Sequence, residues 1–165
     1  MKILFVGSLT EGQTSLMRME VLQELGYDVV PLSTQINWDR AHMVTRRLQQ
    51  SLGAGPIVEK INKDLIEAVK TARPDVVWAE KQEYFKPDIL REISEMGVKL
   101  IHYTPDPYFS LSWKQTKLLD SCLPLYDCLI TSKKYELDDY RKINRHVVYM
   151  QLGYDERVHR PSFPR

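Results

Sequence analysis

The amino-acid sequence predicts an α/β fold, a Rossmann-like parallel sheet of about six strands with helices on both faces. Short apolar runs recur along the chain, and stretches with helical spacing separate them. The runs are apolar at nearly every position, which is typical of strands buried on both faces of a parallel sheet. Glycine or proline stands at most of the boundaries between these segments. This alternation favours parallel strands joined by right-handed crossovers.

The first strand, helix and second strand form one unit at the start of the chain. Residues 2–6, apolar after Lys2, predict a strand, and a helix is expected to follow Gly12 and to stop at Gly26. Residues 29–32 predict the next strand. The loop at residues 7–14 should therefore lie at the carboxyl edge of the sheet, where ligands bind in doubly wound folds.

The remaining elements follow in the same alternation. Arg73-Pro74 suits the end of a helix, and Pro87 suits the first turn of another. Residues 53–56, Gly-Ala-Gly-Pro, separate two helical stretches. Helices are predicted over residues 38–52, 57–71, 87–96 and 136–142, and strands over residues 75–79, 98–103, 127–131 and 146–150.

Length and composition indicate a single domain over residues 1–165, and the alternation of strands and helices makes it Rossmann-like. The hydrophobic content of 43% and the charged content of 27% are ordinary for a globular protein. A net charge of +1 gives no reason to expect a nucleic-acid partner. Cys122 and Cys128 match no metal or redox spacing, and no apolar run approaches the ~18 residues of a membrane span. We therefore expect a cytoplasmic domain without an integral membrane segment.

The first loop has glycines spaced as in a P-loop but lacks its lysine. Gln13 stands where that lysine would reach the phosphates, so an NTPase is not expected. The second strand ends in Ser33-Thr34 without an acidic residue for a ribose, which disfavours a dinucleotide site. Two interpretations stay open: a capping box formed by Thr10 and Gln13, and close approach of a ligand to the helix start. The candidate cleft residues of this loop are Gly7, Ser8, Glu11, Gly12 and Thr14.

Two other loops offer cations at strand ends. Lys81 follows the third predicted strand and belongs either to a solvated surface pair or to a site for a phosphate or an acidic acceptor. Lys133 follows the fifth, beside hydroxyl side chains. Thr104 and Lys133 are arranged as in phosphoacceptor receiver domains. Such domains also need an acidic cluster after strand one and an aspartate after strand three; the sequence has neither, which excludes that class.

The loop at residues 102–108, His-Tyr-Thr-Pro-Asp-Pro-Tyr, carries the most chemistry. Tyr103 and Tyr108 could stack on a flat or sugar-like ligand. Asp106, held between two prolines, is a candidate general base or hydroxyl-binding group, or else the cap of a following helix. His102 ends an apolar strand, where a histidine is often a satisfied core residue.

A metal site is not expected. The histidines are scattered without ligand spacing at positions 42, 102, 146 and 159. A Gly-x-Ser-x-Gly nucleophile elbow is also absent from the sequence. Metal-assisted and triad-type hydrolysis are therefore not predicted.

Four segments, taken in order, resemble a known family. They are the start Lys-Ile-Leu-Phe-Val-Gly-Ser-Leu, Arg-Pro-Asp-Val-Val-Trp at residues 73–78, His-Tyr-Thr-Pro-Asp-Pro at residues 102–107, and residues 151–161. Their order and spacing resemble the amino-terminal half of GT-B glycosyltransferases, with most likeness to the CgeB-like (spore-maturation type) branch. The resemblance covers nearly the whole chain. It implies that Gly153, Tyr154 and Asp155 lie where the first Rossmann-like domain passes into the second.

The resemblance implies transfer of a sugar from a nucleotide-sugar donor to a small-molecule or glycan acceptor. In GT-B enzymes a second Rossmann-like domain usually binds the donor, so we expect this chain to be the acceptor-side half and inactive alone. Asp106 would then be the catalytic residue that orients or deprotonates an acceptor hydroxyl, without a metal. Two alternatives are a stand-alone nucleotide- or sugar-binding module without catalysis, and a small transferase complete in itself.

A basic stretch within residues 38–52 carries Arg40, Arg46 and Arg47 beside apolar side chains. It could contact an anionic acceptor or a membrane surface. Its modest charge density favours a solvated amphipathic helix packed on the sheet.

Overall fold

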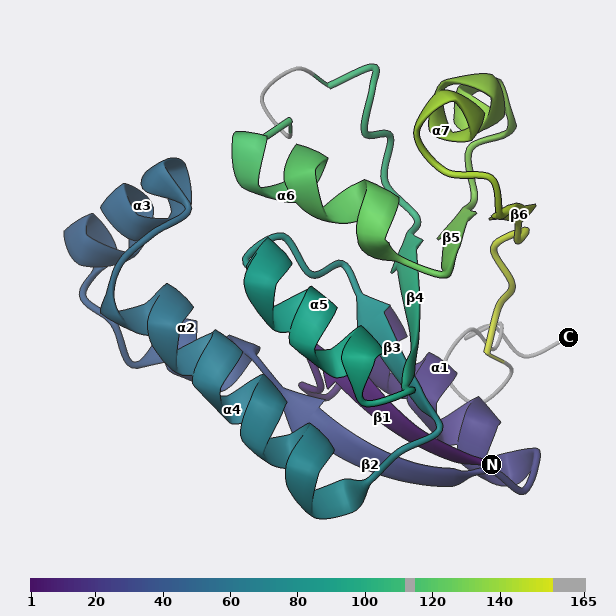
Figure 1. Cartoon of the computed structure of the whole chain (residues 1–165), viewed down its shortest axis with the longest axis horizontal. Helices are drawn as coiled ribbons and strands as arrows, with labels where there is room; N and C mark the ends of the chain where they lie inside the picture. The colour runs from purple at the N-terminus through teal and green to yellow at the C-terminus, as the bar shows by residue number, and fades with distance from the viewer. Residues whose placement is uncertain (112–114, 156–165) are drawn as a thin grey trace, which may run out of the picture.

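The computed structural model describes residues 1–111 and 115–155 of the chain (Figure 1). Across these residues the strands form one sheet in the order β2-β1-β3-β4-β5-β6, and every neighbouring pair is parallel. This is the predicted α/β fold with the predicted number of strands. The strands are β1 (Lys2–Gly7), β2 (Asp28–Ser33), β3 (Val76–Glu80), β4 (Lys99–Thr104), β5 (Cys128–Thr131) and β6 (Val147–Tyr149).

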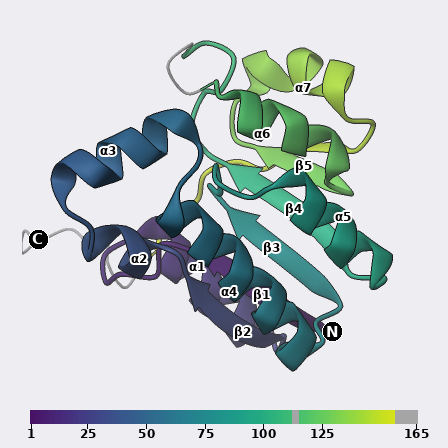
Figure 2. The ribbon, with the colours of Figure 1, turned by 60° about the vertical axis from the view of Figure 1, so that its left-hand side comes forward.

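Helices cover both faces of the sheet, as the sequence predicted. On one face α4, α5 and α6 lie side by side, and α1 lies on the other (Figures 1 and 2). None of the helices in the described part of the chain is long and apolar enough to cross a membrane. The helices are α1 (Thr14–Glu24), α2 (Gln35–Asp39), α3 (Met43–Leu52), α4 (Pro56–Ala72), α5 (Pro87–Glu95), α6 (Lys117–Cys122) and α7 (Leu137–Ile143), with 3₁₀ turns η2 (Leu123–Leu125) and η3 (Lys134–Glu136).

The central strands are buried because apolar side chains leave them on both faces. Leu4, Val77 and Leu100 point to the α4–α5 side and have no exposed area. Phe5 points to the α1 side and is equally buried. The edge strand β2 is half-exposed and contains Pro31, which lacks the amide that a central strand would need. Because the strands are buried on both faces, their sequences are apolar runs, and this allowed them to be predicted.

The helix predicted over residues 38–52 is wrong as a single element. The chain turns at residues 40–42, and His42 is extended at the start of α3. Trp38, at the end of α2, is buried with its ring centre 4.8 Å from that of Tyr84. The two short helices therefore point in different directions, although their residues form one helical pattern along the sequence.

Two local predictions also need correction. The Thr10–Gln13 capping box does not form, because Gln13 is itself the N-cap residue of α1 and makes no side-chain capping bond. Helix α6 lies between β4 and β5, where the sequence pattern gives no range for a helix. Its N-cap Thr116 accepts a hydrogen bond from the Leu119 amide at 3.1 Å, a local signal that the short apolar pattern obscured.

The sheet has a topological switch point between β1 and β3. From β1 the chain moves to β2 on one side, and then returns to β3 on the other. Crevices at the carboxyl ends of such strands are where open α/β sheets bind ligands. The two strand ends approach closely here, since a Cβ built on Gly7 would lie 3.1 Å from the Cβ of Glu80.

Candidate functional site

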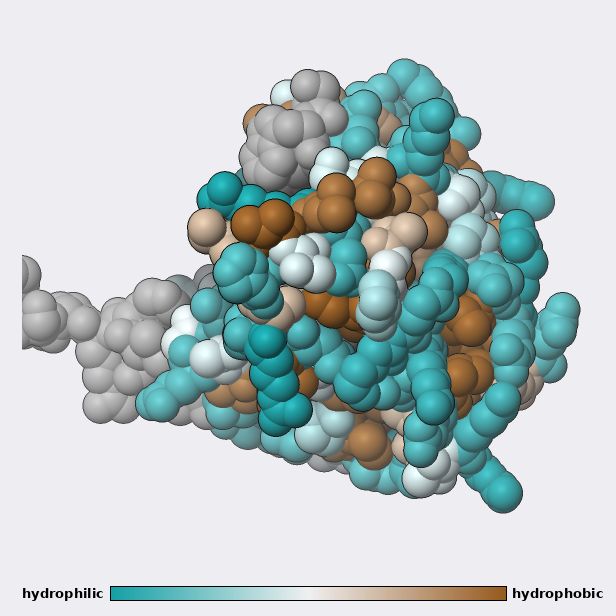
Figure 3. All heavy atoms as spheres, turned by 90° about the vertical axis from the view of Figure 1, so that its left-hand side faces the viewer, coloured by the Kyte–Doolittle hydropathy of each residue, from teal (hydrophilic) through white to brown (hydrophobic). Residues whose placement is uncertain are grey.

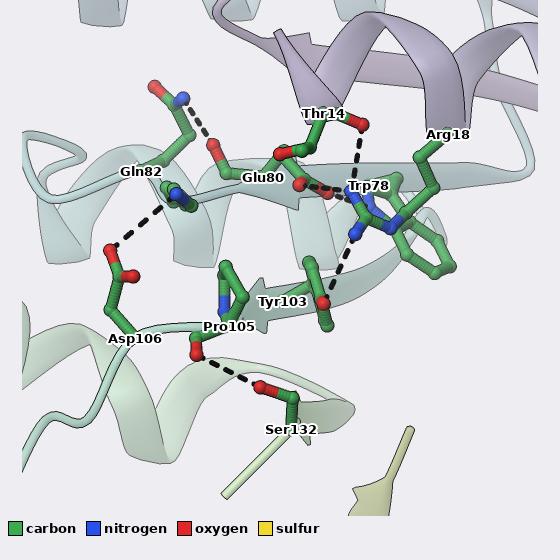
Figure 4. A network of polar contacts seen from close by, with 10 residues as sticks. Thr14, Arg18, Trp78, Glu80, Gln82, Tyr103, Pro105, Asp106 and Ser132 are labelled. Carbon is green, nitrogen blue, oxygen red and sulfur yellow. Dashed lines mark hydrogen bonds and ion pairs between the residues drawn. The ribbon is translucent and has the colours of Figure 1, made fainter. Parts of the chain in front are cut away.

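A buried ion pair underlies the switch point. Arg18 Nη1, from α1, donates to Glu80 Oε1 at 2.7 Å, and Trp78 Nε1 donates to Glu80 Oε2 at 3.1 Å. Arg18 Nη2 donates to the Tyr103 hydroxyl oxygen at 3.1 Å, while the guanidinium lies 4.3 Å from the centre of the Tyr103 ring. Figure 4 shows Arg18 reaching toward β3 and β4 at this point. These contacts fasten the start of α1 to the ends of two strands.

Glu80 is a structural carboxylate rather than a ligand-facing one. Its side chain has no exposed area. Burial raises the pKa of Glu80 above its ordinary value, and the Arg18 guanidinium opposes that rise without cancelling it. Since a buried charge is tolerated only with a partner, removing Arg18 would strand this carboxylate.

Lys81 and Asp106 come together at the carboxyl ends of β3 and β4, next to the switch point. Lys81 has φ 52°, in the left-handed region, and its amide donates to the Tyr103 carbonyl at 2.9 Å. Its Nζ lies 3.5 Å from Asp106 Oδ2, with 40% and 41% of the two side chains exposed. A pair this exposed is screened and adds little stability. Both groups therefore remain accessible to a ligand at the edge of the sheet.

The segment that carries Asp106 is held from two sides. Ser132 Oγ, after β5, donates to the Pro105 carbonyl at 2.9 Å (Figure 4). The buried Glu136 carboxylate accepts hydrogen bonds from the Tyr108 amide at 2.8 Å and from the Ser110 amide and hydroxyl at 2.9 Å each. Asp106 does not cap the helix that follows, because α6 has Thr116 as its N-cap. The carboxylate thus sits on a segment with a fixed path.

His102 is a satisfied core residue and not a base. Only 3% of it is exposed, and its Nε2 lies 3.2 Å from the Gln82 carbonyl oxygen. A carbonyl accepts but cannot donate, so that nitrogen carries the proton of a neutral ring. Burial lowers the pKa of His102 to about 4, with the Gln82 bond opposing the change. The ring is therefore uncharged near neutral pH.

The described residues form a small cavity behind the pair. A cavity of about 10 Å³ lies there, room for about one water. A hollow of about 640 Å³ lies at the opposite edge of the sheet, near Arg73, Asp75 and Met96. A ligand of Lys81 and Asp106 would thus rest on the open carboxyl edge. The small cavity is lined by Lys81, Glu83, His102, Thr104, Pro107, Tyr108, Leu119, Leu123 and Tyr140.

The other predicted residues spread along the same edge. Thr104 pairs with Thr131 in the register of β4 and β5, and Lys133 follows two residues later, half-buried. After β6, the edge strand opposite β2, Gly153 and Tyr154 are exposed and Asp155 is half-buried. In the first loop the candidates are buried Gly7, half-buried Ser8 and exposed Glu11, Gly12 and Thr14. The rest of the motif that begins at residue 151, namely residues 156–161 with His159, lies outside the described residues.

The prediction that Tyr103 and Tyr108 stack on a ligand is wrong. Tyr103 has no exposed area because Arg18 and Trp78 pack on its ring. Tyr108 is 5% exposed, and its hydroxyl donates to Asp120 Oδ1 at 2.6 Å. Both rings are parts of the core beneath the loop.

The sequence patterns did not single out Arg18, Glu80 or Glu136, of which the two carboxylates are buried and Arg18 is half-buried. One signal was present for Glu80: side chains alternate along a strand, so Glu80 shares a face with the inward-facing Trp78. No comparable signal marks Arg18, which meets Glu80 across 62 positions of sequence. Within residues 1–111 and 115–155, no cluster of three or more histidine, cysteine or carboxylate side chains is arranged to hold a metal ion.

Comparison with known proteins identifies the fold. No protein-family model matches the chain, and no curated protein matches its sequence. Among solved structures, the crystal structure of Glycyrrhiza uralensis UGT73P12 complexed with glycyrrhetinic acid 3-O-monoglucuronide matches with a TM-score of 0.54 and 10% sequence identity. The match covers 86% of this chain and 46% of that one, so the chain spans about half the length of the neighbour. The likeness shows a Rossmann-like α/β domain of the kind found in GT-B glycosyltransferases.

Proposed function

We propose that this chain is the acceptor-side domain of a GT-B glycosyltransferase, within the CgeB-like branch, and that it binds the hydroxyl that receives the sugar. The Lys81–Asp106 pair at the ends of β3 and β4, next to the switch point, is the observation that supports this most directly. A similar fold occurs in a glycosyltransferase whose structure contains a glycoside. In this proposal a second Rossmann-like domain supplies the nucleotide-sugar, and the chain alone does not turn over.

In the proposed reaction Asp106 is the catalytic residue. Its carboxylate accepts the proton of the acceptor hydroxyl as that oxygen bonds to the anomeric carbon of the sugar. The bond between that carbon and the donor phosphate breaks, and the nucleotide leaves with the electron pair. Lys81, 3.5 Å from Asp106, keeps a cation beside the carboxylate. No step uses a metal.

The remaining candidates fit around this pair. The first loop and the start of α1 present backbone amides and the positive end of a helix dipole at the same edge of the sheet. Thr104 and Lys133 line the adjoining part of the edge, and Gly153-Tyr154-Asp155 continues toward the proposed donor domain. These residues would contact the acceptor or the leaving group. The first loop would contribute Gly7, Ser8, Glu11, Gly12 and Thr14.

Ligand binding by this chain separates the candidate functions. In saturation-transfer NMR we expect signals from hydroxyl-bearing glycosides, and calorimetry should detect no binding of UDP-, GDP- or ADP-sugars. Asp106→Asn should weaken glycoside binding about tenfold or more, since hydrogen bonds to charged groups contribute about 1.5–3 kcal/mol. Asp139→Asn is the matched control, because that carboxylate is also 41% exposed and ion-paired, but on α7.

Three results would overturn the proposal. Glycoside binding unchanged in Asp106→Asn would remove that residue from its role. Tight binding of a nucleotide-sugar to the chain would mean that the donor pocket is already present. Release of nucleotide by the chain alone would show a complete transferase.

A stand-alone binding module is the second candidate. The observation in its favour is the start of α1 at the switch point, with Gly12 at φ 81° in the loop before it. That geometry suits a phosphate without any catalytic base. It predicts that ATP or a nucleotide-sugar binds equally well to the Asp106→Asn variant.

A further inference from the structure

Helix α3 has its polar side toward the protein and its apolar side toward solvent. Gln49 is 6% exposed, whereas Val44, Leu48 and Leu52 are 63%, 58% and 67% exposed. These three apolar residues are four positions apart, so they form one stripe along the helix. An amphipathic surface helix of a globular protein normally has the reverse orientation. The outward apolar stripe therefore indicates a binding surface.

The orientation of α3 is fixed by hydrogen bonding and close packing. Gln49 Oε1 accepts a hydrogen bond from the Ile57 amide at 2.8 Å, at the start of α4. The backbone of Gly55 passes so near that a Cβ there would lie 2.6 Å from Gln49 Cγ. Turning α3 over would break this bond and leave the Ile57 amide without the Gln49 acceptor. The stripe thus stays on the surface of the folded chain.

The same surface is positively charged. From residue 40 to residue 58 the chain has three arginines and neither aspartate nor glutamate. Arg40 and Arg47 are exposed, and Arg47 lies beside Leu48 on the outward side of α3. Arg46 is turned inward and is half-buried. We call Met43, Val44, Leu48 and Leu52, together with Arg40 and Arg47, the α3 surface.

The α3 surface is convex and stands at one end of the molecule. Figures 1 and 2 show α3 projecting beyond the ends of the strands, away from the sheet. Figure 3 faces this side and shows a brown apolar stripe bordered by teal polar atoms. A projecting helix offers no groove for a peptide. A flat surface that is apolar inside and negatively charged outside complements it in both shape and charge.

We infer that α3 binds the surface of a bilayer that contains anionic phospholipid. The stripe would enter the boundary between headgroups and acyl chains, and Arg40 and Arg47 would meet lipid phosphates. Because α3 follows β2, it stands at the carboxyl edge of the sheet, where Lys81 and Asp106 lie. Binding would hold that edge against the membrane. This inference does not depend on the proposed function, since vesicle binding needs no sugar transfer.

Co-sedimentation with vesicles tests the inference. The chain should sediment with vesicles of phosphatidylcholine and phosphatidylglycerol, but not with phosphatidylcholine alone, and added salt should weaken the binding. The paired change Leu48→Ser and Leu52→Ser should lower the partition coefficient about tenfold or more. The paired change Arg40→Gln and Arg47→Gln should lower it at least about fivefold.

The control replaces two exposed apolar side chains by serine at a different place on the surface. Val21 and Leu25 lie at the end of α1 and are 43% and 68% exposed, so Val21→Ser with Leu25→Ser should leave vesicle binding unchanged. All substituted side chains are exposed, and circular dichroism checks that each variant is folded. Absence of binding to anionic vesicles, or binding that the leucine variant retains, would overturn the inference. So would a dimer in light scattering that the leucine variant dissociates, because a second copy would then cover α3.

Discussion

The uncharged His102 makes the stability of this protein sensitive to acid. Its pKa is lowered from 6.5 to about 4 by burial, so the unfolded chain takes up a proton at higher pH than the folded one does. The stabilising contribution is present above pH 6.5 and is lost as the pH falls through about 4. The loss amounts to about 3 kcal/mol, since each unit of pKa corresponds to about 1.36 kcal/mol.

Urea unfolding at a series of pH values measures this contribution. His102→Phe should flatten the pH dependence of the free energy of unfolding between pH 6.5 and pH 4, because no imidazole remains to titrate. His42→Asn, at an exposed position, is the control and should leave the slope unchanged. If His102→Phe shows the slope of the parent chain, the histidine is not the residue responsible.

Gly7 is required by contact rather than by backbone conformation. A Cβ at this position would lie 3.1 Å from the Cβ of Glu80, which is fixed to a central strand and cannot swing away. Gly7→Ala should therefore lower the free energy of unfolding by about 1–3 kcal/mol. Gly153→Ala, where a Cβ meets no atom within 4 Å, should change the urea midpoint little. Equal midpoints for the two variants would contradict the close approach.

At the residue level, sequence patterns predicted which charged residues lie at strand ends but not which of them form ion pairs. Lys81 and Asp106 could be named as candidates because each follows an apolar strand. Their pairing depends on the left-handed backbone conformation of Lys81, which cannot be predicted from the presence of a lysine. The burial of Tyr103 could not be predicted for a related reason, since its partner Arg18 is distant in sequence.

Among the elements, residues 108–110 after β4 are held by one buried carboxylate. Glu136 accepts hydrogen bonds on both oxygens, from Tyr108 on Oε2 and from Ser110 on Oε1. An amide at this position would turn an NH₂ group toward one of the two backbone amides. Glu136→Gln should therefore cost about 1–3 kcal/mol and loosen this segment.

Amide hydrogen exchange reports the loosening directly. In Glu136→Gln the Tyr108 or Ser110 amide should exchange at least about fivefold faster. Amides of β1 should exchange faster only by the factor that corresponds to the change in the free energy of global unfolding. Asp138→Asn changes an exposed carboxylate near the start of α7 and should leave both amides unaffected. Unaltered exchange at both amides in the Gln variant would show that the segment is held by other contacts.

The strands were more predictable than the helices for a physical reason. Strands buried on both faces are apolar throughout, and this marks β1 and β3 without knowledge of their neighbours. Helix α3 reverses the usual rule, with Gln49 inside and Leu48 outside, so its pattern predicts the wrong face. Helix α6 is short, and its start depends on the Thr116 cap rather than on periodicity.

At the scale of the whole molecule, one continuous core joins the elements on the α4–α5–α6 side of the sheet. It runs from Val58 and Leu65 on α4, through Leu100 on β4, to Leu129 on β5. A core shared by both ends of the sheet implies cooperative unfolding, because disrupting any part exposes the rest. Far- and near-ultraviolet circular dichroism should therefore report the same urea transition.

A single substitution in this core should shift both signals together. Leu65 has no exposed area and lies against the centre of the sheet, so Leu65→Ala should lower the free energy of unfolding by about 2–5 kcal/mol. Leu25→Ala, at a position 68% exposed, should change it by less than about 0.5 kcal/mol. Two separated transitions in the Leu65→Ala variant would mean that the β1–β3 part can unfold without the β4–β6 part. The Lys81–Asp106 pair joins β3 to β4, so it would then span two independent units and could not hold a fixed geometry at the switch point.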